Sequence, residues 1–300
     1  MYEQISRNKW KSAALVGFFM AFIFVLVWFF EYMTGWGKGG LVLAVLVAMG
    51  TAAVGYYSSD KIVLTISRAR PVTKEEHPYL YNVVEGLAIA AGIPSPKCYV
   101  IEDTAPNAFA AGRKPETAVI CVTTGILEKL NRVELEGVIA HEMSHIKNFD
   151  VRLQTLVVVM AGVVALLSDW MLRSFWWGGG RRRGRSKSGS GGAEGVLVLV
   201  GLALAVLSPF IATIIQLAVS RKREFLADAS SAQLTRYPAG LASALRKISA
   251  DTEPLEAANK ATAHLYIVNP LKNLKGGGGI NRLFSTHPPI EERIAALEKM

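Results

Sequence analysis

Four long blocks of apolar residues alternate with polar segments along the chain. The blocks are Ala13 to Phe30, Leu41 to Tyr57, Leu153 to Ser168 and Gly195 to Val219, and the first contains no charged residue. Each is long enough, or nearly so, for a helix that crosses a bilayer, which takes about 17–25 residues. The first block is also longer than the apolar core of a signal peptide, and no small-residue cleavage site follows it. The pattern therefore predicts an integral membrane protein whose first block is retained as a helix.

Positive charges predict which side of the membrane the polar segments face. Basic residues precede the first block and follow the second, whereas only Lys38 lies between the two. By the positive-inside rule, both outer flanks of this hairpin face the cytoplasm. The third and fourth blocks are ambiguous, because crossing the membrane would place the basic loop between them outside, against the same rule. We favour four spans; a second hairpin that lies on or dips into the bilayer is the alternative.

The polar segments have the periodicity of an α+β domain. Helical spacing extends over Glu75 to Ala91, Val133 to Phe149, Glu224 to Leu234, Ala239 to Ala250 and Pro288 to Lys299. Short runs typical of strands cover Lys97 to Ile101, Asn107 to Gly112 and Thr117 to Val122. The sequence thus predicts a mostly α fold with a small β-sheet beside the helix of residues 133–149.

These segments divide the chain into four regions. Residues 1–57 are expected to form an N-terminal transmembrane hairpin, and residues 58–150 the first part of the polar domain. A second hydrophobic hairpin with a basic loop at 173–194 follows over residues 151–219, and residues 220–300 complete the polar domain.

Composition and charge exclude some classes of function. The formal net charge is +9, but six Lys and Arg residues and no acidic residue fall between Arg173 and Lys187. Without this segment the net charge is +9 − 6 = +3. An excess of positive charge that lies mostly in one Gly/Ser/Arg loop argues against a general nucleic-acid-binding surface. The two cysteines, Cys98 and Cys121, form no C-x-x-C pair. We therefore expect buried reduced thiols rather than a thiolate metal site or a disulfide framework.

The strongest chemical signal is His141-Glu142-x-x-His145, within the predicted helix 133–149. Imidazoles four residues apart project from one face of a helix, close enough to share one ion. Glu142, rotated by about 100°, can stand beside the ion and take a proton from water without binding the metal. The alternative is a solvated helix, since the motif arises by chance in about one chain in a hundred of this size.

A zinc ion held by two histidines needs at least one further protein ligand. The metzincin spacing would require glycine and histidine where this chain has Asn148 and Val151, so that class is excluded. Glu224 and Asp228 share one face of a second predicted helix, which suits a His2Glu site. Glu224 would bind zinc, and Asp228 would accept the other ring N–H of a ligand histidine. A solvated carboxylate pair beside neighbouring arginines is the alternative.

With these motifs, the chain resembles the HtpX family of membrane-bound gluzincin proteases, which are related to the CAAX prenyl proteases. The matching pieces, in the family's order, are Asn107 to Gly112, His141 to His145, Arg223 to Asp228 and Ser285 to Pro289. The resemblance implies a gluzincin-type α+β protease domain and a zinc-dependent endopeptidase. It also implies a multi-pass protein of the cell membrane, with its active site facing the cytoplasm. Its expected role is protein quality control under stress.

The resemblance gives roles to two further pieces of the chain. Residues Asn107, Ala108, Phe109 and Ala110 would form the sheet edge to which an extended or misfolded polypeptide adds as a strand. Asn107 would also polarise a substrate amide. His287 would donate a hydrogen bond to the oxyanion that forms during hydrolysis. The alternatives are an ordinary internal strand and a histidine at a helix entry.

Two other classes of protein remain as rivals. A zinc-handling transporter would carry ligands inside its membrane spans, whereas the candidate ligands here lie outside the apolar blocks. A catalytically inactive zinc-binding scaffold would usually have a broken ligand set, and this set is complete. The sequence therefore predicts a metalloendopeptidase that uses Zn2+ and acts on polypeptides at a lipid bilayer, without a nucleic-acid partner.

Overall fold

The computed structural model describes residues 2–34, 53–160, 221–258, 262–270 and 288–300, with the single positions Val42, Leu46 and Gly50. Several predictions from the sequence lie outside these residues. They concern the fourth apolar block, parts of the second and third, the basic loop at 173–194 and His287.

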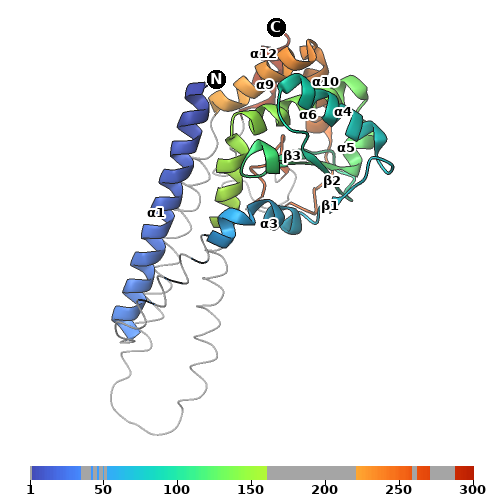
Figure 1. Ribbon diagram of the computed structural model, residues 1–300. Coiled ribbons are helices and arrows are strands. Elements are labelled where there is room, and N and C mark those ends of the chain that lie inside the picture. The colour runs from blue at the N-terminus through green and yellow to red at the C-terminus, as the bar shows by residue number, and fades with distance from the viewer. Residues whose placement is uncertain are drawn as a thin grey trace.

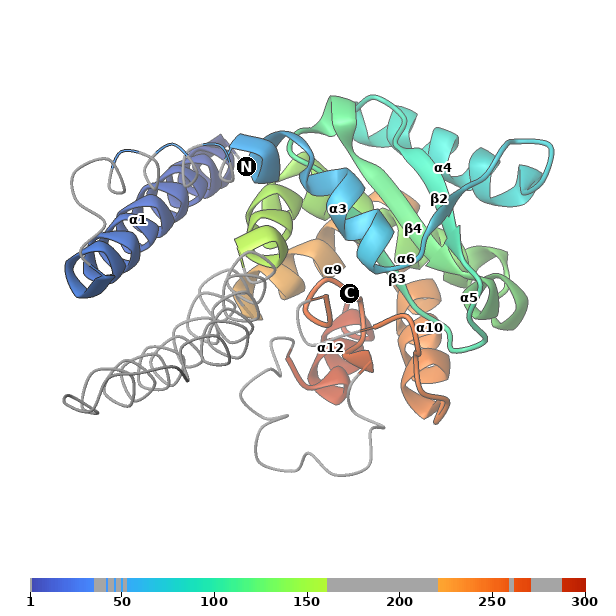
Figure 2. The ribbon, with the colours of Figure 1, turned by 90° about the horizontal axis from the view of Figure 1, so that it is seen from below.

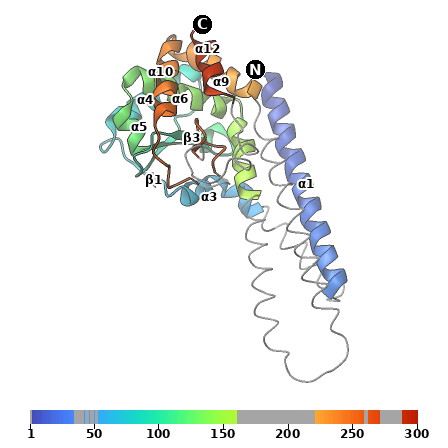
Figure 3. The ribbon, with the colours of Figure 1, turned by 180° about the vertical axis from the view of Figure 1, so that it is seen from behind.

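The first helix, α1 (Tyr2–Thr34), extends away from the body that the other elements form (Figure 1). Its N-terminal end lies beside α9 (Arg221–Thr235), as opposite views agree (Figures 1 and 3). Asn8, Ser12 and Phe19 are buried, whereas Trp10 and Phe18 are among its exposed side chains. Within the residues that the structure describes, no helix is both long enough and apolar enough to cross a membrane.

The body is mostly helical and contains one small sheet, as the sequence predicted. Its other elements are α3 (Ser59–Ile66), β1 (Arg70–Pro71), α4 (Pro78–Ala91), β2 (Lys97–Ile101), β3 (Ala108–Ala111), the 3-10 turn η1 (Pro115–Thr117), β4 (Val119–Thr123), α5 (Thr124–Lys129), α6 (Arg132–Lys147), α10 (Pro238–Ala250) and α12 (Ile290–Leu297). Residues 150–160 are also helical. The predicted strand 97–101 coincides with β2, while α3 and β1 were not predicted.

The sheet has the strand order β1-β2-β4-β3. Strands β2 and β4 are parallel, and the outer strands β1 and β3 run antiparallel to their neighbours. All five residues of β4 are buried. A strand covered on both faces reads as a continuous apolar run, which explains the sequence Val119-Ile120-Cys121-Val122. Strand β3 forms one edge of the sheet.

The two faces of the sheet pack against different helices (Figure 2). Side chains such as Val100, Ile120 and Val122 contribute to the larger core, which includes residues of α4, α6 and α10. The opposite face, with Phe109 and Cys121, packs in a second cluster with residues of α3 and with Tyr266. Cys98 and Cys121 are both buried, which confirms the expected burial of the two thiols, and no disulfide joins them.

Helix α6 begins at a capping box. The Asn131 side chain accepts a hydrogen bond from the backbone N–H of Glu134, and the Glu134 side chain accepts one from the backbone N–H of Asn131. These two bonds satisfy backbone donors that the first turn of a helix leaves unpaired. The start of α6 at Arg132 is therefore fixed, nine residues before His141 in the same helix.

Candidate metal centre and active site

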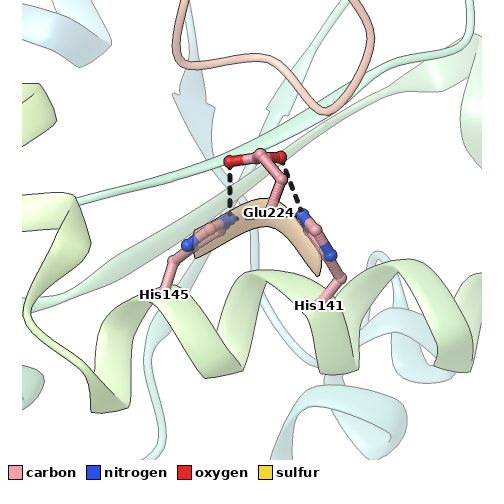
Figure 4. Close-up of side chains that lie close together, drawn as sticks. All are labelled: His141, His145 and Glu224. Carbon is pink, nitrogen blue, oxygen red and sulfur yellow. Dashed lines mark hydrogen bonds and ion pairs between the residues drawn. The ribbon is translucent and has the colours of Figure 1, made fainter. Parts of the chain in front are cut away.

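Three side chains from two helices meet in the interior of the body (Figure 4). His141 and His145 come from α6 and Glu224 from α9, and all three are buried. The Nε2 atoms of the two imidazoles lie 3.2 Å apart. Glu224 directs one carboxylate oxygen at each ring, with Oε2 3.7 Å from His141 Nε2 and Oε1 3.5 Å from His145 Nε2.

This arrangement has the shape and the chemistry of a metal site. Tetrahedral zinc, with bonds of about 2.0–2.1 Å, requires its ligand atoms to lie roughly 3.3 Å apart. The two imidazole nitrogens lie 3.2 Å apart, and the nearest Glu224 oxygen lies 3.5–3.7 Å from each of them. With one ligand atom taken from each residue, all three atoms lie within 4.8 Å of one another, so small side-chain rotations would bring them to the zinc spacing. Two imidazoles and a carboxylate are also the ligand set of one class of catalytic zinc sites. The residues present therefore fit a zinc ion.

Electrostatics favours a cation at the same point. Burial disfavours the charged form of His141, but hydrogen bonds to Asp228 and Glu224 outweigh this effect and raise its pKa to about 9. Arg293 opposes the shift, so the two carboxylates outweigh its positive charge as well. The same carboxylates would attract a divalent ion.

A carboxylate orients each histidine through the nitrogen that faces away from Glu224. His141 Nδ1 lies 2.9 Å from Asp228 Oδ1, and His145 Nδ1 lies 3.1 Å from Asp150 Oδ2. A carboxylate on Nδ1 keeps the proton there and leaves Nε2 available as a metal ligand. Asp228 thus occupies the position that the sequence reasoning gave it. Asp150 was not anticipated.

Arg293, from α12, supports the same cluster and was also missed from the sequence. Its Nε and Nη2 atoms donate to the two oxygens of Asp228, at 2.9 and 2.7 Å. Its Nη1 donates to the carbonyl of Ile267 at 3.1 Å and lies 3.8 Å from Glu224 Oε2. Burial would raise the pKa of Asp228, but Arg293 and His141 outweigh it and lower that pKa. Asp228 therefore stays ionised as a partner for His141.

Glu142 is buried beside the three candidate ligands. Burial raises the pKa of its carboxyl group, and Glu224 acts in the same direction. The two imidazoles and a hydrogen bond with the backbone of Ala110 oppose this shift. Ala110 belongs to the edge strand β3, so Glu142 lies between the histidine pair and the sheet edge. A carboxylate with a raised pKa in this position can accept and return a proton.

The residues predicted to bind substrate lie at and before β3, and part of that edge contacts the chain itself. Asn107 Nδ2 donates to the carbonyl of Val268 at 2.9 Å, and Ile267 N donates to the carbonyl of Ala108 at 3.0 Å. The Phe109 ring packs edge-on against Tyr266, with 5.1 Å between centroids. The four residues Asn107, Ala108, Phe109 and Ala110 are all buried.

No short-range signal could have revealed Asp150 or Arg293. Asp150 is five residues from His145, but it follows the end of α6, where Phe149 adopts a positive φ of 60° and interrupts the helix. Arg293 lies 65 residues from Asp228 along the chain. Its charged side chain in an amphipathic helix is typical of a solvated face. Only the folded chain brings these groups together.

Comparison with known proteins agrees with the geometry. The model of Peptidase family M48 matches residues 74–300. The chain is 49 % identical over 303 residues to a Protease HtpX homolog of Dictyoglomus turgidum, covering 100 % of this chain and 94 % of the relative. It is 45 % identical over 300 residues to a Protease HtpX homolog of Thermoanaerobacter pseudethanolicus, covering 100 % and 98 %.

A solved structure is also similar. The crystal structure of S. mikatae Ste24p is 20 % identical, with a TM-score of 0.47, and the similarity covers 97 % of this chain and 64 % of that chain. The present chain thus spans less than two thirds of that protein. The M48 match and the full-length HtpX relatives establish the family, and they confirm the resemblance that the motifs indicated. The chain belongs to peptidase family M48 and, within it, to the HtpX proteases.

Proposed function

We propose that the chain is a zinc-dependent endopeptidase that cleaves extended or misfolded polypeptides. The observation that carries the proposal is the convergence of His141, His145 and Glu224 at distances of 3.2–3.7 Å, with Glu142 buried beside them. A metal-binding scaffold without catalysis would not need a buried carboxylate with a raised pKa next to the ligand set.

The chain's own residues divide the work of hydrolysis. His141, His145 and Glu224 would hold zinc, which supplies a Lewis acid that polarises the peptide carbonyl and acidifies water. Asp228 and Asp150 keep the two imidazoles in the tautomer that leaves Nε2 available. Glu142 takes the proton from the attacking water and passes it to the leaving amine. His287 is proposed, from the family resemblance, to stabilise the oxyanion.

The position of β3 supports an extended substrate. It is an edge strand, and Ala110 contacts Glu142 through its backbone, while Ala108 already accepts a hydrogen bond from Ile267 of the chain itself. A polypeptide that adds to this edge beyond Ala108, or that displaces the segment around Ile267, would place a peptide bond near the proton-transferring carboxylate. Binding through backbone hydrogen bonds selects for unfolded segments more than for particular side chains. This preference suits quality control of damaged proteins under stress.

We further propose that the chain is embedded in the cell membrane, with its active site facing the cytoplasm. The four apolar blocks of the sequence support this location. So do the side chains of Phe18 and Val25 on α1, which are 52 % and 57 % exposed. Apolar side chains exposed along a helix that extends from the body are suited to contact with lipid.

The deciding experiment compares Glu142→Gln with Glu136→Gln in the purified full-length chain. Both substitutions remove one carboxylate from α6, but Glu136 pairs with Arg132 at the surface, 2.9 Å away. Glu142→Gln should keep zinc and lose casein cleavage by about 10²–10⁴-fold, the usual contribution of a general base. Glu136→Gln should keep both. Retained cleavage in Glu142→Gln would refute the mechanism, and a wild-type chain that binds zinc but cleaves nothing would favour the inactive scaffold.

A further inference from the structure

The buried amide of Asn8 connects the N-terminal helix α1 to Asp150, a partner of the candidate ligand His145. Asn8 is 3 % exposed and lies 142 residues before Asp150. Its Nδ2 atom donates to Asp150 Oδ1 at 2.7 Å and to the carbonyl of Asn148 at 2.9 Å. A primary amide has two N–H donors, so both bonds can form at once.

Asp150 connects this amide to a candidate zinc ligand. Its other oxygen, Oδ2, lies 3.1 Å from His145 Nδ1, while Oδ1 also receives Arg223 Nη1 at 3.3 Å. Asp150 is 2 % exposed, so its hydrogen bonds come from the protein and not from bulk solvent. Of the two donors to Oδ1, Asn8 makes the shorter contact and Arg223 carries the positive charge. Asn8 and Arg223 together therefore set how the carboxylate is turned towards His145.

The turn that carries Asp150 also contacts α1 at a second point, Lys9. Phe149 has a φ of 60°, a conformation that costs a non-glycine residue about 1–3 kcal/mol unless its surroundings enforce it. Lys9 Nζ lies 4.6 Å from the centroid of the Phe149 ring. Asn8 binds the residues on either side of Phe149. Two consecutive residues of α1 thus contact the turn 148–150, which connects α6 to the next helix.

We propose that Asn8 is a positioning residue for the metal centre. From α1 it holds Asp150, and through Asp150 it holds the imidazole of His145 in the orientation that binds zinc. The inference rests on the proposed zinc site. It assigns to the N-terminal helix a role in the active site in addition to its proposed role in the membrane. The hydrogen bond from Asn8 to Asp150 then becomes a condition for tight metal binding.

The test measures zinc affinity by competition with a fluorescent chelator, using the purified full-length chain. Removing an outer partner of a ligand histidine typically weakens metal binding by 10–100-fold. Asn8 acts one bond further out, so Asn8→Ala should weaken zinc binding by about tenfold, the low end of that range. Asn8→Asp keeps the shape but sets a second carboxylate against Asp150, so it should weaken binding at least as much.

Lys9→Ala is the matched control, because it removes a contact of α1 with the same turn without touching Asp150. It should leave zinc affinity at the wild-type level, even if the melting temperature of the zinc-free chain falls. The variant Asp150→Asn already changes the contact with His145. The double variant that also carries Asn8→Ala should therefore lose little further zinc affinity. The KM for casein should stay unchanged in Asn8→Ala at saturating zinc.

Three results would overturn the inference. They are unchanged zinc affinity in Asn8→Ala, an equal loss in Lys9→Ala, or independent, multiplying losses in the double variant. Each would mean that Asn8 only helps α1 to pack. Failure of the proposed function looks different: a wild-type chain that binds zinc without cleaving any polypeptide would refute the protease mechanism and leave the assignment of Asn8 intact.

Discussion

Arg293 is the largest of the fully buried side chains in the part of the chain that the structure describes. Its guanidinium balances a dense group of acidic and imidazole side chains around the metal centre. Burial lowers the pKa of Arg293, but Asp228, Glu224 and Glu142 outweigh this effect and raise it. The residue is therefore charged at any physiological pH. Its fork of donors matches the two oxygens of Asp228 in a way that a lysine could not reproduce.

Replacement of Arg293 should destabilise the fold strongly. Arg293→Met leaves the Asp228 carboxylate buried without its main counter-charge, which typically costs about 3–5 kcal/mol of unfolding free energy. Arg293→Lys keeps the charge but loses the paired geometry and should cost less. Arg246→Met is the matched control, since Arg246 pairs with Glu298 on the surface and such pairs are worth about 0–1 kcal/mol. Denaturant unfolding of the three variants measures these values, and equal losses at positions 293 and 246 would contradict the role given to Arg293.

At the scale of elements, the meeting of α6 with α10 depends on two glycines. A Cβ on Gly137 would lie 2.7 Å from the backbone N of Leu241, and one on Gly240 would lie 2.5 Å from the carbonyl oxygen of Val133. Both contacts are with backbone atoms, which cannot move aside as a flexible side chain can. The close approach of α6 and α10 therefore requires glycine at both positions, although glycine lowers the helix propensity of each segment.

The variant Gly137→Ala tests whether the steric clash with α10 outweighs the higher helix propensity of alanine. Alanine is favoured over glycine by about 1 kcal/mol inside a helix, but overpacking against α10 should cost about 1–3 kcal/mol and dominate. Gly86→Ala is the control within α4, because nothing lies within 4 Å of its added Cβ. That variant should become more stable by about 0.4–1 kcal/mol. Thermal unfolding measures whether each variant is more or less stable than the wild type. A more stable Gly137→Ala would show that α6 and α10 can move apart at little cost in free energy.

At the scale of the whole molecule, the sequence predicts most elements whose pattern is local. The strand at 97–101 and the helices around His141 and Glu224 follow from apolar periodicity and helix-stop residues. The short α3 and the two-residue β1 were missed, because neither is long enough to establish a period. The capping box at Asn131 and Glu134 was readable from its spacing, yet it was not used to begin α6.

The residues of the candidate site also fall into two groups, those in local sequence motifs and those that only tertiary packing brings to the site. His141, Glu142 and His145 form a local motif, and Glu224 with Asp228 form another, so the sequence identifies both halves. That the two halves meet was inferred from the needs of a zinc ion and not from any pattern. Asn8, Asp150 and Arg293 have no such signature. Each is an ordinary polar residue whose importance arises from contacts set by tertiary packing.

Removal of the metal should therefore weaken the whole body, because the candidate ligands and their partners connect α1, α6, α9 and α12. An ion that binds only the folded chain adds about 2.7 kcal/mol at a concentration 100 times its dissociation constant and about 4.1 kcal/mol at 1,000 times. For a body of this size, that corresponds to roughly 5–15 °C in melting temperature. We expect chelation to lower the melting temperature by this amount and added zinc to restore it. In His145→Ala, which has lost a ligand, the chelator should have no effect. If metal analysis proves the ion absent and the wild-type melting temperature is unchanged, the cluster does not couple these helices through a bound metal, and its carboxylates and Arg293 alone hold them together.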